Sequence, residues 1–208
     1  MGTDLANNSP GDSARRRADE LKAASPVRAF LARLLHVHTD ERAFRKGSRG
    51  EEEVARRLLQ LGDGWHVIHA IQVDESGTDI DHLAIGPAGV FSLNTKNHLN
   101  ANVWVAENVI MVNGKKVPYL RNSRSEGARA SRTLSRACGF AVEVRPVIVV
   151  MASKLTFKGH PIDVDVVARK KIVKWLSIQP VRLTPEAVLF IYTKARDGHT
   201  WLPRSGKS

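Results

Sequence analysis

The chain has 208 residues, 42% of them hydrophobic, which is enough for one domain with a buried core and an extension. Its formal net charge of +11 favours a polyanionic partner, either nucleic acid or an anionic membrane surface. The single cysteine, Cys138, excludes an intramolecular disulfide and a zinc site of several cysteines, and fits a reducing cytoplasm. There is no signal-peptide pattern, and no apolar run approaches the ~20 residues that span a bilayer. We therefore expect a cytoplasmic protein without stable membrane insertion.

Residues 1–44 are predicted to form a basic N-terminal arm and a short helix. Residues 1–25 are rich in Asn, Ser, Gly, Asp and Arg, a composition typical of a mobile segment. Val27–Leu35 is amphipathic and accompanied by arginines. This pattern fits either a short docking helix or a helix that lies on a membrane surface.

The compact domain is predicted to span residues 45–160. Ser48 and Glu51 have the spacing of a capping box, which predicts a helix that begins at Ser48 and ends near Gly62. A β-branched strand follows over residues 65–73. Next come a hairpin over Asp79–Asn97 and two further short strands, with turns near residues 107–108 and 113–114.

The second half of the chain is predicted to close the domain. Residues 125–139 read as a helix and residues 144–151 as a strand buried on both faces. Residues 161–208 form a C-terminal extension that packs on the core, with helices over 163–178 and 184–197; Thr184 caps the second of these. The order of elements predicts an α/β or α+β domain around a mixed sheet.

Polar residues occur where the predicted hairpin is most strand-like. If Gly86–Gly89 is a four-residue loop, Asp81 lies opposite Asn94 and Asp79 opposite Lys96. Side chains alternate along a strand, so all four share one face. Carboxylate and amide oxygens suit a magnesium ion that orients water and neutralises phosphate charge, with a lysine nearby. A solvated salt-bridge patch between Asp79 and Lys96 is an equally good interpretation of the spacing.

Three stretches resemble a known family: "GSRGEEEVARRLLQL", "DIDHLAIGPAGVFSLNTKN" and "RNSRSEGARASRTL". They are similar to the NERD domain, the nuclease-related domain of the PD-(D/E)XK nuclease-like superfamily. The resemblance covers residues 45–160 and implies a restriction-endonuclease-like core of helix, three strands, helix and strand, with a mixed central sheet and C-terminal helices. It also implies a Mg²⁺- or Mn²⁺-dependent site for DNA phosphodiester cleavage.

The resemblance assigns roles by position. Glu51 is the acid on the helix, Asp81 the metal-binding aspartate and Lys96 the signature lysine, and these three are the expected catalytic residues. The expected metal ligands are Asp81, Asn94, Glu51 and Glu126. Asn94 departs from the superfamily pattern, which has Glu, Asp or Gln there, so the site loses one negative charge. Glu126 can return a carboxylate if its helix begins beside the hairpin.

A row of arginines follows the predicted site. Arg129, Arg132 and Arg136 lie at i, i+3 and i+7, on one stripe of the predicted helix. Arg121 and Arg124 extend the basic surface toward Glu126. Guanidinium groups match phosphate oxygens, so all five are predicted to bind nucleic acid. The alternative is a helix face that only contacts solvent.

Three functions from different classes fit these observations. The leading hypothesis is a metal-dependent nuclease or DNA-processing protein. The second is a catalytically degenerate module that binds nucleic acid without cutting it, and Asn94 separates the two. The third is a peripheral membrane protein that uses the basic arm and Val27–Leu35.

Overall fold

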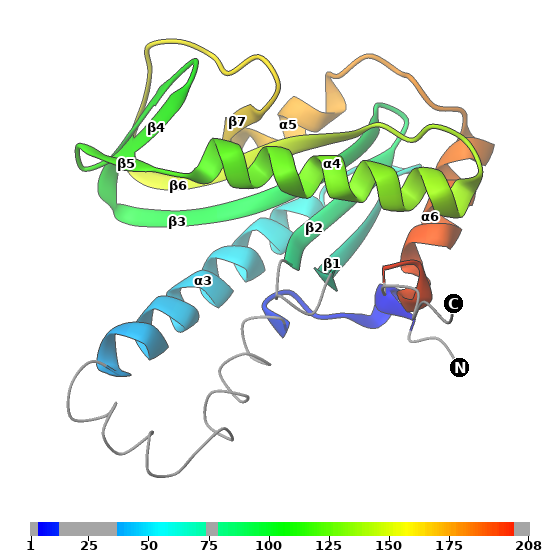
Figure 1. Ribbon diagram of the computed structural model, residues 1–208, viewed down its shortest axis with the longest axis horizontal. Helices are drawn as coiled ribbons and strands as arrows, with labels where there is room; N and C mark the ends of the chain where they lie inside the picture. Colours follow the sequence, from blue (N-terminus) through cyan, green and yellow to red (C-terminus); the bar gives the residue numbers. More distant parts are fainter. Residues whose placement is uncertain (1–3, 13–36, 74–78, 202–208) are drawn as a thin grey trace, which may run out of the picture.

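The protein is described by a computed structural model over residues 4–12, 37–73 and 79–201. Most of the predicted basic arm, including Val27–Leu35, lies outside these residues. The described chain forms three layers, with a seven-stranded mixed sheet between helices (Figure 1). The predicted α/β class with a mixed central sheet is therefore confirmed. No helix in the described ranges is long and apolar enough to cross a membrane.

The elements follow the predicted core order of helix, three strands, helix and strand. Short 3-10 turns also occur at η1 (Leu5–Asn7), η2 (Arg169–Lys171) and η3 (Gly198–Thr200). The helices and strands are α3 (Val37–Leu58), β1 (His66–Gln72), β2 (Asp79–Gly86), β3 (Gly89–Ala106), β4 (Val109–Val112), β5 (Lys115–Val117), α4 (Tyr119–Cys138), β6 (Val144–Phe157), β7 (Asp165–Ala168), α5 (Ile172–Ser177) and α6 (Pro185–Arg196).

Strand β3 is the centre of the sheet. One of its edges pairs in parallel with β6, and β6 pairs in turn with β7. Its other edge pairs antiparallel with β2 over residues 89–93 and with β4 over residues 103–106. Between these two ladders, residues 94–102 of β3 pair with neither β2 nor β4, and we call this gap in the pairing the opening in the sheet. The pairing of β3 with β6 shifts register between His98 and Asn102, within the same stretch.

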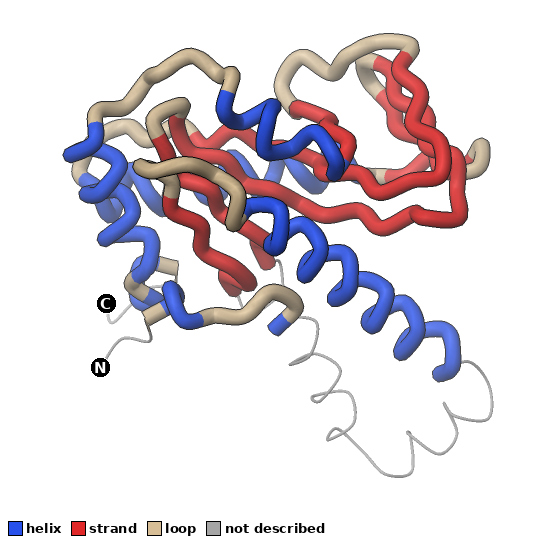
Figure 2. Tube along the Cα trace, turned by 180° about the vertical axis from the view of Figure 1, so that it is seen from behind, coloured by secondary structure: helices blue, strands red, loops and turns tan. Residues whose placement is uncertain are grey.

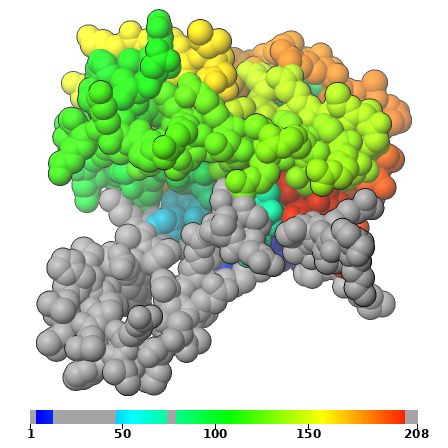
Figure 3. Space-filling model, viewed as in Figure 1, coloured from blue at the N-terminus to red at the C-terminus, as the bar shows by residue number. Residues whose placement is uncertain are grey.

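Hydrophobic clusters cover both faces of the sheet, and a third cluster packs around Val103, Ile110 and Leu120. On one face, Val54 and Leu58 of α3 pack with α5 against Phe91 and Leu93. On the other, α4 and α6 pack against β1 and β2, for example through Leu134. Helix α3 lies in front of the sheet in Figure 2 and α4 in Figure 1, so the helices cover opposite faces. The outer side of α4 forms a band across the front surface in Figure 3.

Helix α3 begins earlier than the sequence pattern predicted. It starts at Val37, so Ser48 lies inside it, and the Ser48 Oγ donates to Glu52 Oε1 at 3.2 Å. The prediction of a helix start at Ser48 was wrong, because a serine within a helix can bond side chains of its own helix without ending it. Helix α4 likewise begins at Tyr119, directly after Pro118, rather than near residue 125.

Two other elements differ from the sequence prediction. Residues 163–178 were predicted as a helix, but Asp165–Ala168 forms strand β7 and the helix α5 begins only at Ile172. The β-branched valines there add a parallel strand to β6, so tertiary pairing overrides the helical pattern. Strand β3 is also one continuous strand of 18 residues, where two strands were expected.

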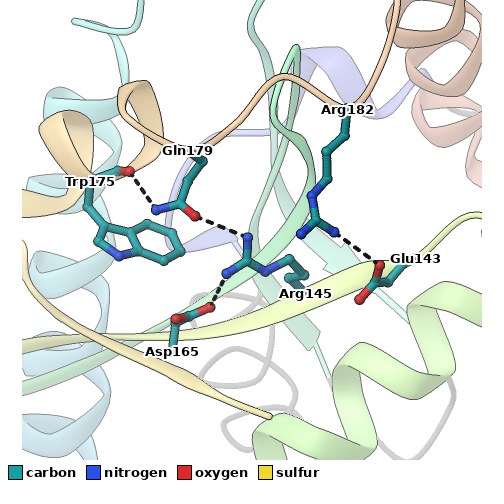
Figure 4. A network of polar contacts seen from close by, with 6 residues as sticks. All are labelled: Glu143, Arg145, Asp165, Trp175, Gln179 and Arg182. Atoms are coloured by element: carbon teal, nitrogen blue, oxygen red, sulfur yellow. Dashed lines mark hydrogen bonds and ion pairs between the residues drawn. The ribbon is translucent and has the colours of Figure 1, made fainter. Parts of the chain in front are cut away.

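Arg145 fastens the C-terminal extension to the sheet (Figure 4). Its guanidinium donates to Asp165 at 2.8 Å and to Gln179 at 3.1 Å. The same group lies over the rings of Phe91 and Trp175, with centroids 5.3 and 5.6 Å away. One side chain on β6 thus connects β7, α5 and β3, which fixes the sheet edge remote from the opening.

Candidate active site

The site begins where β2 separates from β3. The predicted pairing of Ile85 with Val90 is confirmed, and the ladder continues as far as His82 and Leu93. At the next position Asp81 Oδ2 accepts a hydrogen bond from the Thr95 N–H at 2.6 Å. A carboxylate therefore takes the place of a backbone carbonyl, and the two strands part at the opening in the sheet.

Helix α4 brings Glu126 to this opening. Asn94 Nδ2 donates to Glu126 Oε2 at 2.8 Å, and α4 begins at Tyr119, whose ring lies beside Lys96 of the predicted hairpin. Glu126 is only 4% exposed. Burial, followed by the charge of Asp81, raises the pKa of Glu126 to about 8, although Asn94 and Lys96 oppose the rise.

Helix α3 brings Glu51 from the opposite face. Glu51 is 8% exposed, and its carboxylate accepts a hydrogen bond from the backbone N–H of Gly11. Burial, followed by the charge of Asp81, raises the pKa of Glu51 to about 8. Burial also raises the pKa of Asp81, against the opposing effects of Lys96 and the Thr95 N–H. The three acids and Lys96 therefore form one electrostatic cluster between the two helices.

Two glycines let these helices approach the sheet. A Cβ at Gly50 would lie 3.0 Å from the Asn97 Cβ, and one at Gly127 would lie 3.1 Å from the Pro146 Cβ. Gly50 directly precedes Glu51, and Gly127 directly follows Glu126. Each acid is therefore next to the point of closest contact between its helix and the sheet, which fixes its depth in the opening.

Lys96 lies over an aromatic ring that the sequence analysis did not single out. Its Nζ is 5.1 Å from the ring centroid of Tyr119, the first residue of α4. The Tyr119 hydroxyl and His98 Nε2 are 2.9 Å apart. A cation over an aromatic face is attracted to it, so Tyr119 restricts where the ammonium can lie. Lys96 and Tyr119 are far apart in the sequence, and no motif indicated that they would meet.

The donor atoms of the cluster fit a hard divalent cation. Glu51 Oε2, Asn94 Oδ1 and Glu126 Oε1 are buried and have no hydrogen-bond partner among the described residues. Buried acceptors of this kind need a donor or a cation. Across the described chain, no group of three or more His, Cys, Asp or Glu side chains is arranged to hold a metal ion. Magnesium needs only one or two carboxylates, completed by other oxygens, so the residues present are sufficient.

The structure separates the predicted arginines from the acidic cluster. Arg121, Arg132 and Arg136 are exposed on the outer side of α4, whereas Glu126 is buried on its inner side. Arg129 is partly exposed on the outer side, and Arg124 forms an ion pair with Asp163 at 2.6 Å. The five residues lie on the same helix as Glu126, and three of them are exposed where Glu126 is buried.

Comparisons with known proteins agree with the sequence resemblance. Residues 46–151, just over half of the chain, match the profile of the family described as NERD, the nuclease-related domain. Comparisons with curated proteins and with solved structures each found no match. The matched residues include Lys96 and all the acids of the cluster.

Proposed function

The chain belongs to the NERD family of nuclease-related domains, and on that premise we propose that it is a metal-dependent phosphodiester hydrolase that cuts DNA. The observation that carries this proposal is the meeting of Asp81, Asn94 and Glu126 at one opening of the sheet. Buried oxygens without a partner lie on Asn94 and Glu126, and Lys96 acts electrostatically on the same acids.

The charge of the cluster supports a cation requirement. Electrostatic interactions connect four acids: Glu51, Asp79, Asp81 and Glu126. Lys96 is a cation that acts on Glu51, Asp81 and Glu126. A phosphodiester is an anion, and like charges repel strongly where water is excluded. Because Glu51 and Glu126 have pKa values of about 8, much of this negative charge develops only when the acids lose their protons, and a bound cation would compensate it as the phosphate approaches.

Each residue of the cluster has a separate role in the proposed reaction. Asp81, the Asn94 oxygen and Glu126 would hold Mg²⁺ or Mn²⁺, with Glu51 on the side of α3. When bound, such an ion supplies a positive charge for the phosphate and orients the attacking water. Lys96 neutralises charge that develops on the phosphate oxygens. Glu51 would also be the carboxylate that accepts the proton which the attacking water loses. A water oxygen bonds to phosphorus, the bond to the leaving oxygen breaks, and that oxygen takes up a proton.

A second candidate function is a module that binds DNA without cutting it. The observation that favours it is Asn94, an uncharged ligand whose nitrogen donates to Glu126. A weaker ligand set holds the ion less tightly, and a site without an ion has no cation to neutralise the phosphate or to orient the water. The two functions share the same family and the same basic surface, and they differ in one measurable reaction.

The experiment incubates supercoiled and linear DNA with purified protein and Mg²⁺, Mn²⁺ or EDTA. Asp81→Ala, Lys96→Ala and Asn94→Glu are compared with wild type. Asp63→Ala and Lys174→Ala, at exposed positions, are matched controls for the loss of an acid and of a lysine. The proposal expects metal-dependent cutting by wild type and both controls, and a loss of at least about 100-fold in Asp81→Ala and Lys96→Ala.

Two other results would argue against the proposed nuclease activity. If wild type binds DNA but never cuts it, and Asn94→Glu gains cutting, the protein is the binding module. If no variant binds DNA even at low salt, both functions are wrong.

A further inference from the structure

We propose that residues 4–12, which precede the family-matched part of the chain, belong to the site and position Glu51. We name them the N-terminal strap. The inference rests on the proposed function, because it assigns the strap a role toward the ion that Glu51 would help to hold. Gly11 acts through Glu51 and contacts no substrate, so it is a positioning residue.

The decisive contact is made by the Gly11 backbone. Its N–H donates to the Glu51 carboxylate, and Gly11 is buried with φ +80°. A Cβ at this position would lie 2.5 Å from Ser48 Oγ. Ser48 is three residues before Glu51 and therefore on the same side of α3. Only glycine combines this backbone conformation with so close an approach, so the strap meets α3 at the turn that carries the acid.

Two further contacts hold the strap in place. Asn8 Nδ2 donates to the backbone oxygens of His69 and Ala70, both at 3.1 Å, where β1 is kinked by the positive φ of Ala70. Asp4 forms an ion pair with Arg196, in which Arg196 Nε donates to Asp4 Oδ1 at 3.0 Å. The strap is thus attached to α6, to β1 and to α3, and Figure 2 shows it passing along the ends of β1 and β2 to α3.

Leu5 adds an apolar attachment. It packs against the core cluster that contains Val188 and Ile191 of α6. An element that buries an apolar side chain and makes several specific hydrogen bonds has one defined position. The position of Gly11 relative to α3 is therefore set from the opposite end of the molecule.

Glu51 needs such a constraint. Its carboxylate is buried beside Asp81, and the Gly11 N–H is a backbone donor that reaches it from outside α3. A donor on the carboxylate also fixes its rotation and leaves Oε2 as the oxygen without a hydrogen-bond partner. Groups that orient a metal-facing ligand in this way commonly change affinity for the ion about 10–100-fold when they are removed.

The test releases the strap at points remote from Glu51. Asn8→Ala removes two hydrogen bonds, and Asp4→Arg breaks the ion pair with Arg196. The double variant Asp4→Arg/Arg196→Asp restores an ion pair of reversed polarity, and Glu186→Gln on the exposed side of α6 is the matched control. Each variant is measured for Mn²⁺ affinity by calorimetry, for DNA cutting, and for melting temperature.

The proposal expects Mn²⁺ affinity to fall about 10-fold in Asn8→Ala and Asp4→Arg and to recover in the charge-swapped pair. In a Glu51→Ala background the same changes should have no further effect on the affinity, because the strap acts through Glu51. Fully additive losses, or an unchanged affinity when hydrogen exchange shows the strap released, would overturn the proposal.

Hydrogen exchange of residues 4–12 supplies a readout that does not depend on cutting. Coupling between two groups is reciprocal, so Glu51→Ala should speed exchange in the strap of wild-type sequence. If wild type binds no Mn²⁺ and cuts no DNA, the proposed function is wrong, and faster exchange in Glu51→Ala still supports the contact. Unchanged exchange in Glu51→Ala overturns the positioning role whatever the activity.

Discussion

Asn94 changes the charge of the site with a single side chain. Its nitrogen donates to Glu126, which leaves the amide oxygen buried without a hydrogen-bond partner among the described residues. Glu126 supplies a carboxylate from α4 next to the position where the superfamily pattern has an acid or a glutamine. A carboxyl group from α4 thus lies beside the amide of the strand, and the amide holds it in place.

The raised pKa values predict how stability depends on pH without metal. Glu126 has a pKa of about 8 in the folded protein against 4.5 as its ordinary value. The folded state therefore holds a proton that the unfolded state loses, so the stabilisation is complete below pH 4.5 and is lost as pH rises toward 8. Relative to wild type, Glu126→Gln should lose less stability between pH 5 and 8 in urea denaturation with EDTA.

The matched control for this measurement is Glu143→Gln, at an exposed carboxylate. Comparing each variant with wild type cancels contributions from the histidines. Added Mg²⁺ should raise the melting temperature of wild type more at pH 8 than at pH 5.5, because the ligands are then ionised. Equal pH profiles for wild type and Glu126→Gln would contradict the assigned burial of this acid.

Tyr119 offers a test of how Lys96 is positioned. Tyr119→Phe keeps the ring under the ammonium, so we expect cutting near the wild-type rate. Tyr119→Leu removes an attraction of about 0.5–2 kcal/mol, which corresponds to a fall in kcat of about 2- to 30-fold. KM should change little, because the effect is on the charged transition state. If Phe and Leu lose activity equally, the hydroxyl bonded to His98 is the group that matters.

Helices α3 and α4 hold the acids because each contacts the sheet through a glycine. Neither contact depends on a cap, and α3 continues through Ser48, where the sequence pattern indicated its start. The depth of each helix is set by side chains on β3 and β6 that the helix meets. At the scale of elements, the site is therefore a property of packing between layers.

Two glycines in α3 provide a matched comparison. A Cβ at Gly47 would meet nothing within 4 Å, whereas one at Gly50 would lie 3.0 Å from the Asn97 Cβ. Gly47→Ala should raise the free energy of unfolding by about 1 kcal/mol through helix propensity. Gly50→Ala should lower it by about 1–3 kcal/mol through overpacking, and should also reduce cutting because Glu51 moves with its helix.

Urea denaturation and a DNA-cutting assay measure both effects. The two variants add the same methyl group to the same helix, so intrinsic propensity cancels between them. Gly50→Ala at least as stable and active as Gly47→Ala would show that α3 does not depend on this contact.

The charge of the whole molecule is distributed unevenly. The acids gather at the opening of the sheet, while exposed arginines lie on the outer side of α4, within a chain of net charge +11. A polyanion is attracted to the molecule as a whole, whereas the acids of the site offer it no positive charge other than Lys96. Binding and cutting can therefore respond separately to salt and to divalent ions.

Salt dependence tests whether the outer side of α4 contacts DNA. Each phosphate contact contributes about 0.9 to the slope of log affinity against log salt concentration. Replacing Arg129, Arg132 and Arg136 together by Gln should lower that slope by about 2–3 if all three make such contacts. Arg182→Gln, which removes an exposed arginine paired with Glu143, is the control. An unchanged slope in the triple variant would place DNA elsewhere on the molecule.

The sequence by itself determined the features that depend on neighbours along the chain. The turn at Gly86–Gly89 set the hairpin register, and the helix cap at Thr184 is present as predicted. Motif spacing indicated the family, which the profile match bears out. Local patterns predicted the element types, except where Asp165–Ala168, within a predicted helix, forms a strand that pairs with β6.

The tertiary structure decided which of the polar residues meet. Glu126 reaches Asn94 across 32 positions of sequence, and Gly11 reaches Glu51 from outside the matched domain. Arg121, Arg132 and Arg136 are exposed on the outer side of the same helix, where Glu126 is buried on the inner side. Such contacts depend on the rotation and depth of helices packed on the sheet, which long-range packing sets and local sequence does not.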